Sequence, residues 1–149
     1  MLSPLRCLRT PVGQKTLLGC ALIVAATWTA LRPRRVEVFG DSMAPALQPG
    51  ERFLAIRPVW LRPGDVVVLA DPRDPRLQMV KRVMWKGAGS GERRAVWVEG
   101  DNARASTDSR ELGVIRQSLV RARLVWRYWP SGRSGRLASP AHRPHRLRP

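Results

Sequence analysis

The sequence is poor in the side chains that most enzymes use as bases, thiol nucleophiles and metal ligands. Among its 149 residues are two histidines, His142 and His145, both in an Arg- and Pro-rich C-terminal segment, and two cysteines, Cys7 and Cys20, at the N-terminal end. A Ser-His-Asp triad needs its imidazole within hydrogen-bond reach of the nucleophile. A thiol nucleophile, a Cys/His metal site or a disulfide framework needs cysteines inside the folded domain. These chemistries are therefore disfavoured, and we expect no cofactor and no metal.

Lysine is scarce as well. Only Lys15, Lys81 and Lys86 are lysines among the 27 Lys and Arg residues. Arginine stays protonated in proteins and cannot act as a base, whereas lysine can lose its proton when it is desolvated. Lys81 lies in the middle of an apolar segment with a strand pattern. A chance surface lysine at a strand edge is the alternative, and the motifs described below favour a chemical role.

Acidic residues are outnumbered, and the net charge is +16. Residues 32–130 hold 19 Lys and Arg against 11 Asp and Glu, and residues 131–149 add five arginines and no acid. Such a surface suits anionic lipid or nucleic acid; Arg-rich composition without a specific partner is the alternative. Because no nucleic-acid-reading motif is present, we expect no specific nucleic-acid partner. The sequence leaves the oligomeric state open.

Long apolar runs are limited to residues 16–31, an uncharged stretch of sixteen residues between Lys15 and Arg32. As a helix it rises about 24 Å against a hydrocarbon core of about 30 Å, and the flanking cations can snorkel to the interfaces. We expect a single transmembrane anchor here, after a basic flank at residues 1–15, with membrane lipid as a partner. A cleaved signal peptide is the alternative, although no Ala-x-Ala site ends the run. The orientation is not set, because the basic residues on its two sides balance.

Beyond Arg35 the pattern changes to short β-type runs divided by Pro and Gly turns, which predicts a mainly β domain, a folded β-sheet barrel, over residues 36–130. Strict alternation predicts that Lys81 shares a strand face with Met79, Val83 and Trp85. It likewise predicts one face for the alternate residues of the last strand from Val120 to Tyr128. Residues 131–149 are expected to be disordered. Strands are expected at residues 36–39, 52–57, 66–70, 77–86, 94–99 and 119–129, with a hairpin between the fourth and fifth.

Three motifs carry the functional prediction: GDSMAP at residues 40–45, MVKRV at 79–83 and GDNARASTDSR at 100–110. In this order and spacing they resemble the signal peptidase I family of membrane-bound serine endopeptidases, over roughly residues 36–130. The resemblance implies a mainly β catalytic domain. It also implies that Ser42 is the nucleophile, Lys81 the base and Ser106 the hydroxyl that hydrogen-bonds and orients Lys81. By the same resemblance, Asp108 and Arg110 form an ion pair behind the site.

The chemistry needs a neutral Lys81, because only an unprotonated amine can take the Ser42 proton. Burial among apolar side chains lowers a lysine pKa from about 10.4 by disfavouring the ammonium. The Ser42 backbone N–H is the expected oxyanion donor. Typical bacterial members place a Ser or Thr two residues before the nucleophile, and Gly40 stands there instead, so the second donor is open. For Asp101 and Asn102 we expect a turn role, satisfying backbone groups.

The sequence thus predicts a membrane-anchored serine endopeptidase that removes N-terminal signal or pro-segments from precursor proteins, in a bacterial plasma membrane or an organelle inner membrane. The short interval between Lys81 and the third motif, with the ending VWRYWP, looks most like the nickel-type superoxide dismutase maturation proteases. General signal peptidase I and a mitochondrial-inner-membrane-type peptidase are the nearer alternatives. A LexA-type self-cleaving regulator and a basic nucleic-acid-binding protein are alternatives of other classes.

Overall fold

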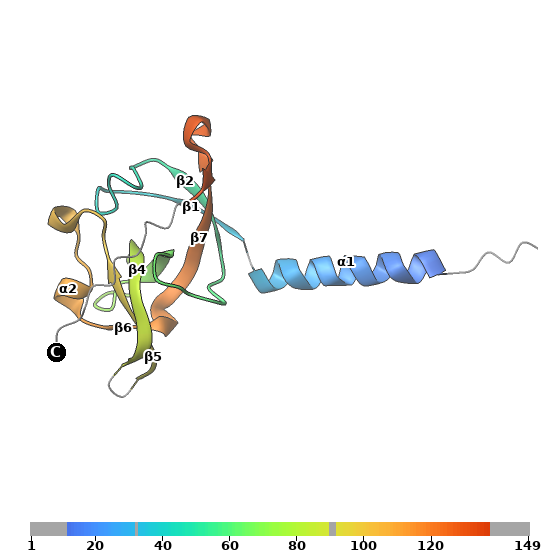
Figure 1. Cartoon of the computed structure of the whole chain (residues 1–149), viewed down its shortest axis with the longest axis horizontal. Coiled ribbons are helices and arrows are strands. Elements are labelled where there is room, and N and C mark those ends of the chain that lie inside the picture. The colour runs from blue at the N-terminus through green and yellow to red at the C-terminus, as the bar shows by residue number, and fades with distance from the viewer. Residues whose placement is uncertain (1–11, 32, 90–91, 138–149) are drawn as a thin grey trace, which may run out of the picture. The chain divides into compact units, whose positions relative to one another are not determined.

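The computed structural model describes residues 12–31, 33–89 and 92–137, which fall into two units that divide between Arg32 and Pro33 (Figure 1). The first unit holds one helix, α1 (Val12–Leu31). Along α1, six large apolar side chains are each 64–73% exposed: Leu17, Leu18, Leu22, Ile23, Val24 and Trp28.

The transmembrane anchor predicted for residues 16–31 is not confirmed. A helix does form there, but no helix in the described part of the chain is both long and apolar enough to cross a membrane. The physical reason is the shortness of the uncharged run, which rises only about 24 Å as a helix. Residues 1–11 of the predicted basic flank lie outside the described part of the chain, and residues 12–15 form the start of α1.

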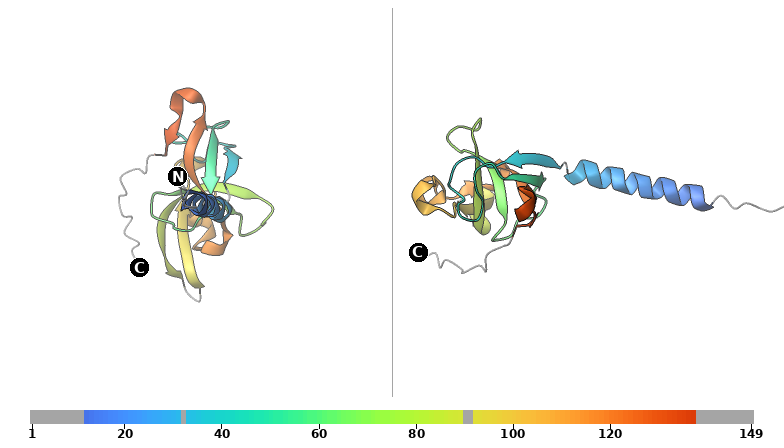
Figure 2. Two further views of the ribbon diagram at one scale, coloured as in Figure 1. Left: turned by 90° about the vertical axis from the view of Figure 1, so that its right-hand side faces the viewer. Right: turned by 90° about the horizontal axis from the view of Figure 1, so that it is seen from above.

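The second unit is built on one antiparallel sheet, and the mainly β prediction is confirmed (Figures 1 and 2). The order across the sheet is β1-β2-β7-β3-β4-β5-β6, with β8 pairing to β7. Short helical turns connect the strands: η1 (Ala103–Ala105), α2 (Ser109–Leu112), η2 (Gln117–Leu119) and η3 (Ser131–Arg133). The strands are β1 (Arg34–Glu37), β2 (Arg52–Ile56), β3 (Val66–Ala70), β4 (Gln78–Gly89), β5 (Glu92–Glu99), β6 (Ile115–Arg116), β7 (Val120–Trp129) and β8 (Gly135–Arg136).

β3 lies at the centre and separates two apolar clusters. Its alternate side chains point to opposite faces, so Val66 and Val68 join one cluster while Val67 and Leu69 join the other. This explains why all five residues of β3 are buried. The first cluster packs β3 against β2, β7 and the loop after β1, and contains Met43. The second packs it against β4 and β5.

A register shift in β4 corrects one face prediction. Val83 pairs with Val98 and Lys86 pairs with Val96, so two residues of β5 span three steps of β4. Paired residues of an antiparallel ladder share a face, and the extra residue of a bulge shifts the alternation that follows it. Lys86, rather than Trp85, therefore returns to the face that carries Lys81 and Val83.

The last strand also departs from simple alternation. The predicted common face from Val120 to Tyr128 is wrong: Val120 packs in the second cluster and Ala122 and Leu124 in the first, with a register shift between them, while Trp126 and Tyr128 are 44% and 37% exposed. Register shifts interrupt the pairing of β7 with β2. Beyond Leu124 the strand accordingly presents large aromatic side chains to solvent.

The predicted boundary of disorder at residue 131 is wrong. η3 and β8 follow directly, and β8 pairs with β7. The Arg133 guanidinium lies 2.8 Å from a carboxylate oxygen of Glu51, which is 3% exposed. An Arg-rich composition indicated disorder, but this buried anion gives one of the arginines a partner. Residues 138–149 of the predicted tail lie outside the described part of the chain.

Candidate active site

Ser42 lies in the turn that follows β1. The Ala44 N–H donates to the Asp41 carbonyl at 3.0 Å, and the Leu47 N–H donates to the Met43 carbonyl at 2.9 Å. Met43 and Leu47 are fully buried in the first cluster, whereas Ser42 is only half-buried. Gly40 has φ 75°, a left-handed conformation that favours glycine. The turn therefore anchors its apolar residues and presents Ser42 at the surface.

Gly100 is the residue around which the motifs meet. A Cβ placed there would lie 2.2 Å from Ser106 Oγ and 2.5 Å from the Ser42 carbonyl oxygen, closer than atoms can approach. The backbone N–H of Asn102, two residues after Gly100, donates a hydrogen bond to the same Ser42 carbonyl at 3.0 Å. The first and third motifs are thus in contact, and only a glycine leaves room for it.

Lys81 faces the same place. Arg82 pairs with Glu99 in the β4–β5 ladder, so continuing this register by one residue places Lys81 opposite Gly100. Residues opposite each other in an antiparallel ladder have Cα atoms about 4.5–5.5 Å apart and share a face. The Lys81 side chain therefore leaves β4 on the face where Gly100 makes room for Ser42 and Ser106.

Lys81 is nearly completely buried, at 4% exposure, beside fully buried Val67 and Val83. Burial lowers the pKa of its amine; the Asp108 carboxylate opposes that shift, and the Arg110 guanidinium adds to it. The direction matches the sequence-based expectation. A lowered pKa raises the population of neutral amine, the form that can accept a proton.

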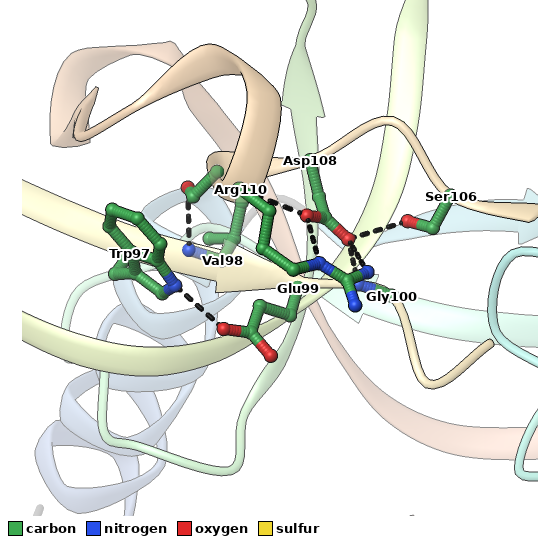
Figure 3. Close-up of polar contacts among 8 residues, drawn as sticks. Trp97, Val98, Glu99, Gly100, Ser106, Asp108 and Arg110 are labelled. Atoms are coloured by element: carbon green, nitrogen blue, oxygen red, sulfur yellow. Dashed lines mark hydrogen bonds and ion pairs between the residues drawn. The ribbon is translucent and has the colours of Figure 1, made fainter. Parts of the chain in front are cut away.

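Asp108 organises the third motif (Figure 3). Its fully buried carboxylate accepts hydrogen bonds from Ser106 Oγ at 2.7 Å, the Gly100 N–H at 2.8 Å and Arg110 Nε at 2.8 Å. Burial alone would raise the pKa of the Asp108 carboxyl, but these donors together hold it well below its usual range. The ion pair with Arg110 that the resemblance implied is present.

Ser106 differs from the expectation. The resemblance implied a hydrogen bond between Ser106 and Lys81, but the hydroxyl proton goes to Asp108, and the described residues contain no hydrogen bond joining Lys81 to Ser106 or to Ser42. The buried anion is the stronger acceptor for that proton. The oxygen lone pairs of Ser106 remain the groups that can meet the Lys81 amine.

Asp101 also differs from its predicted turn role. Its carboxylate accepts two hydrogen bonds from the Arg82 guanidinium, at 2.8 and 2.6 Å, and Arg82 donates a third to the Gly64 carbonyl at 2.9 Å. Arg82 is 4% exposed. The sequence reasoning assigned no role to Arg82 or Gly100. The sequence did offer a signal for each: Arg82 is the residue after Lys81, and Gly100 is the first residue of the third motif.

Within the described residues, no group of three or more His, Cys, Asp or Glu side chains is arranged to hold a metal ion. Around Gly100 the fold instead brings together the backbone of the Ser42 turn, the strand face that carries the buried Lys81, and the Ser106 hydroxyl bonded to the buried Asp108 carboxylate. These are the parts of a nucleophile and its base, without a histidine.

A protein-family model described as "Signal peptidase, peptidase S26" matches residues 12–93 of this sequence, more than half of the chain. The chain belongs to this family. By membership it is a peptidase of the S26 signal peptidase type. The family match does not support the alternatives of a LexA-type regulator or a nucleic-acid-binding protein. The matched segment includes Ser42 and Lys81 and ends before the third motif.

Several curated proteins are similar to this S26 chain. Mitochondrial inner membrane protease subunit 1 of Homo sapiens is 33% identical over 121 residues, which cover 68% of this chain and 73% of the human protein. The subunit 1 of Mus musculus is 31% identical over 110 residues, 61% of this chain and 66% of that protein. Subunit 2 of Mus musculus is 29% identical over 143 residues, 80% of each chain. The match to mouse subunit 1 thus spans just under two thirds of that relative.

These relatives do not support the narrower resemblance to nickel-type superoxide dismutase maturation proteases. They are subunits of the mitochondrial inner membrane type, which the sequence analysis named as an alternative. The short interval between Lys81 and the third motif is explained structurally by a single β4–β5 hairpin.

Proposed function

We propose that this S26 peptidase is a serine endopeptidase in which Ser42 is the nucleophile and Lys81 the general base. The observation that carries the proposal is the close approach of the three motifs at Gly100. The Ser42 carbonyl oxygen and the Ser106 hydroxyl lie against Gly100, and the β4–β5 register puts the buried Lys81 side chain on the same face. Three motifs that are far apart in the sequence, at residues 40–45, 79–83 and 100–110, converge there.

In the proposed reaction, neutral Lys81 takes the proton of the Ser42 hydroxyl as Oγ forms a bond to the carbonyl carbon of the scissile peptide. The backbone N–H of Ser42 stabilises the oxyanion; this N–H has no hydrogen-bond partner among the described residues. The resulting ammonium gives its proton to the departing amine, which breaks the C–N bond and leaves an ester on Ser42. Water, deprotonated by Lys81, then hydrolyses the ester, and the proton returns to Ser42.

Ser106, Asp108 and Arg110 support this chemistry without forming or breaking a bond to the substrate. Asp108 holds Ser106 in place, and Ser106 offers its lone pairs to the amine. Arg110 neutralises Asp108, which limits the pull of that carboxylate on a Lys81 proton. The arrangement keeps a buried lysine oriented and easy to deprotonate.

The substrates we propose are precursor proteins that carry an N-terminal signal or pro-segment, cleaved at a membrane surface. The family description and the names of the similar proteins support this class. Among precursors, we favour those of the mitochondrial inner membrane protease type over a nickel-type superoxide dismutase precursor. We further propose that α1 attaches the protein to the membrane, since a helix with apolar side chains exposed along it is unstable in water.

The test is cleavage of a panel of precursors by the purified full-length protein in detergent, with the product N-termini determined by mass spectrometry. Ser42→Ala should abolish cleavage while the circular dichroism spectrum stays unchanged. The matched control is Ser118→Ala, an exposed serine in η2 outside the site, which should cleave like the wild type. Undiminished cleavage by Ser42→Ala would remove Ser42 from the mechanism.

Membrane attachment is tested separately by fractionation. The full-length protein should stay with membranes through high-salt washing, which releases proteins held by charge alone. Recovery in the soluble fraction with an intact N-terminus would contradict attachment by α1 and would leave the peptidase proposal untouched.

A further inference from the structure

The turn that carries Ser42, residues 41–47, is held through its backbone at two places. Near its start, the Asn102 N–H donates to the Ser42 carbonyl at 3.0 Å. Near its end, Nη2 of Arg127 in β7 donates to the Ala46 carbonyl at 3.1 Å. Arg127 is 81 positions away from Ala46 in the sequence and belongs to none of the three motifs. A side chain of the last long strand therefore reaches the turn of the proposed nucleophile.

A register shift in β7 turns Arg127 inward. Phe53 pairs with Arg127 and Ala55 pairs with Leu124, so β7 has one residue more than β2 between these two pairs. Paired residues share a face, and the extra residue brings Arg127 to the buried face of Phe53, Ala55 and Leu124. The guanidinium lies over the Phe53 ring, 5.4 Å from its centre, and the side chain is 12% exposed.

The buried carboxylate of Glu51 holds this guanidinium in place. It accepts a hydrogen bond from Arg127 Nη1 at 3.1 Å and one from the Gln48 N–H at 3.1 Å, and Arg133 lies 2.8 Å away. The Nε of Arg127 is buried and has no hydrogen-bond partner among the described residues. Arg127 thus donates from its two outer nitrogens to two different acceptors, the Glu51 carboxylate and the Ala46 carbonyl.

The Ser42 hydroxyl needs a fixed direction as well as a fixed depth. Met43 and Leu47 are fully buried in the first cluster and set the depth of the turn, but apolar burial is non-directional. A hydrogen bond weakens steeply when its angle changes, so bonds to the backbone do set direction. A reacting group must be held to about 0.5 Å and about 10–20°. The Asn102 and Arg127 bonds supply this restraint at the two ends of the segment.

We propose that Arg127 is a positioning residue for peptide cleavage: through the Ala46 carbonyl it fixes the orientation of the turn that presents Ser42. Among the described residues, Arg127 makes no hydrogen bond to Ser42, Lys81 or Ser106. It therefore acts on the reaction only through the turn. The inference rests on the proposed function, in which Ser42 is the nucleophile.

The decisive variant is Arg127→Lys. Lysine keeps the positive charge beside Glu51 but has one nitrogen in place of a planar fork, so it pairs with the carboxylate and leaves the Ala46 carbonyl without its donor. The matched control is Arg133→Lys, the same change in the second arginine on that carboxylate. Within the described part of the chain, Arg133 makes no hydrogen bond to the Ser42 turn.

Both full-length variants are assayed in detergent on the precursor that the wild type cleaves fastest. In Arg127→Lys, kcat should fall about ten- to hundredfold, because a displacement of about 1 Å costs about 10²-fold in rate. KM and the rising limb of the pH profile should stay unchanged, because the substrate contacts and Lys81 are unaltered. Arg133→Lys should keep the wild-type kcat. A wild-type kcat in Arg127→Lys, or an equal loss in both variants, would overturn the proposal.

Amide hydrogen exchange tests the restraint without using catalysis. The N–H groups of Ala44 and Leu47 close the turn by bonding to the carbonyls of Asp41 and Met43. They should exchange faster in Arg127→Lys than in the wild type or in Arg133→Lys. Unchanged exchange in Arg127→Lys would contradict the restraint. Faster exchange with a wild-type kcat would mean that the restraint serves stability alone, and the positioning role would be wrong.

Ser42→Ala separates this inference from the proposed function. If Ser42→Ala is inactive and Arg127→Lys cleaves at the full rate, only the positioning role fails. If Ser42→Ala cleaves normally, Ser42 is not the nucleophile, and the proposed function fails together with the role of Arg127.

Discussion

Lys81 and Arg82 are consecutive basic residues on β4, and each is 4% exposed. Their side chains lie on opposite faces of the strand and differ in their hydrogen bonding. Arg82 makes three hydrogen bonds, two to Asp101 and one to the Gly64 carbonyl. Lys81 makes none among the described residues, and burial lowers its pKa. A buried charge is stable only when it is paired. The paired arginine therefore holds the structure together, and the unpaired lysine is left available for chemistry.

The largest effect is expected from replacing Lys81, which tests its role as the base. Lys81→Met should reduce precursor cleavage by a factor of about 10³ or more, because no other side chain at the site can accept the Ser42 proton. The exposed Lys86→Met, on the same face of β4, should cleave normally. Cleavage rates and thermal unfolding of both variants are the measurement.

Lys81→Met should also be as stable as the wild type or more stable at pH 7. The folded-state pKa of Lys81 lies below its unfolded value, so burying this lysine costs folding free energy as long as the unfolded chain carries the proton, and the penalty fades as the pH rises toward the unfolded pKa. A large loss of stability in Lys81→Met would show that the amine has a structural partner.

The second-largest effect is expected from replacing Arg82, which tests its role in stability. Arg82→Gln leaves Asp101 without its guanidinium, and we expect the free energy of unfolding to fall by about 3 kcal/mol, at the low end for a buried pair because Asp101 is partly exposed. The control is Arg76→Gln, whose ion pair with Asp74 lies at the surface and should cost under about 1 kcal/mol. Urea denaturation measures both. Equal effects would mean that burial of the Arg82 pair does not matter.

The third effect concerns the support of Lys81. Ser106→Ala removes one orienting hydroxyl, worth about 1–3 kcal/mol, and should slow cleavage about ten- to hundredfold. Ser106→Thr keeps the hydroxyl and should retain part of the activity. If Ser106→Ala cleaved at the full rate, the hydroxyl would serve Asp108 alone.

The smallest effect is a shift in the pH profile. Cleavage should increase with pH as Lys81 deprotonates, with an apparent pKa below 10.5. Arg110→Gln removes a cation that lowers the pKa of Lys81 and frees Asp108 to raise it, so the rising limb should move to higher pH. The exposed Arg104→Gln should leave the profile in place. A profile in Arg110→Gln that moved to lower pH would reverse the assigned electrostatics.

The site could be predicted as far as its residue types go. Scarcity of His and Cys disfavoured a histidine base, a thiol nucleophile and a Cys/His metal site, and a rare lysine in an apolar strand indicated a base that burial could deprotonate. The apolar run 66–70 predicted β3 with its observed bounds, because a strand covered on both faces must be apolar throughout. These predictions rest on local pattern and on intrinsic pKa values, which the sequence carries residue by residue.

Only the tertiary structure decided which hydrogen-bond partner each polar side chain of the site has. Whether Asp101 satisfies a backbone group or Arg82, and whether Ser106 donates to Asp108 or Lys81, depends on which strands meet, and each pair forms across the fold or within a loop that the fold shapes. Bulges in β4 and β7 reassigned Lys86 and Trp126 to their faces, since one inserted residue reverses a period of two. The sequence determined which groups are capable of the chemistry; the packing around Gly100, where no side chain fits, determined which of them come together.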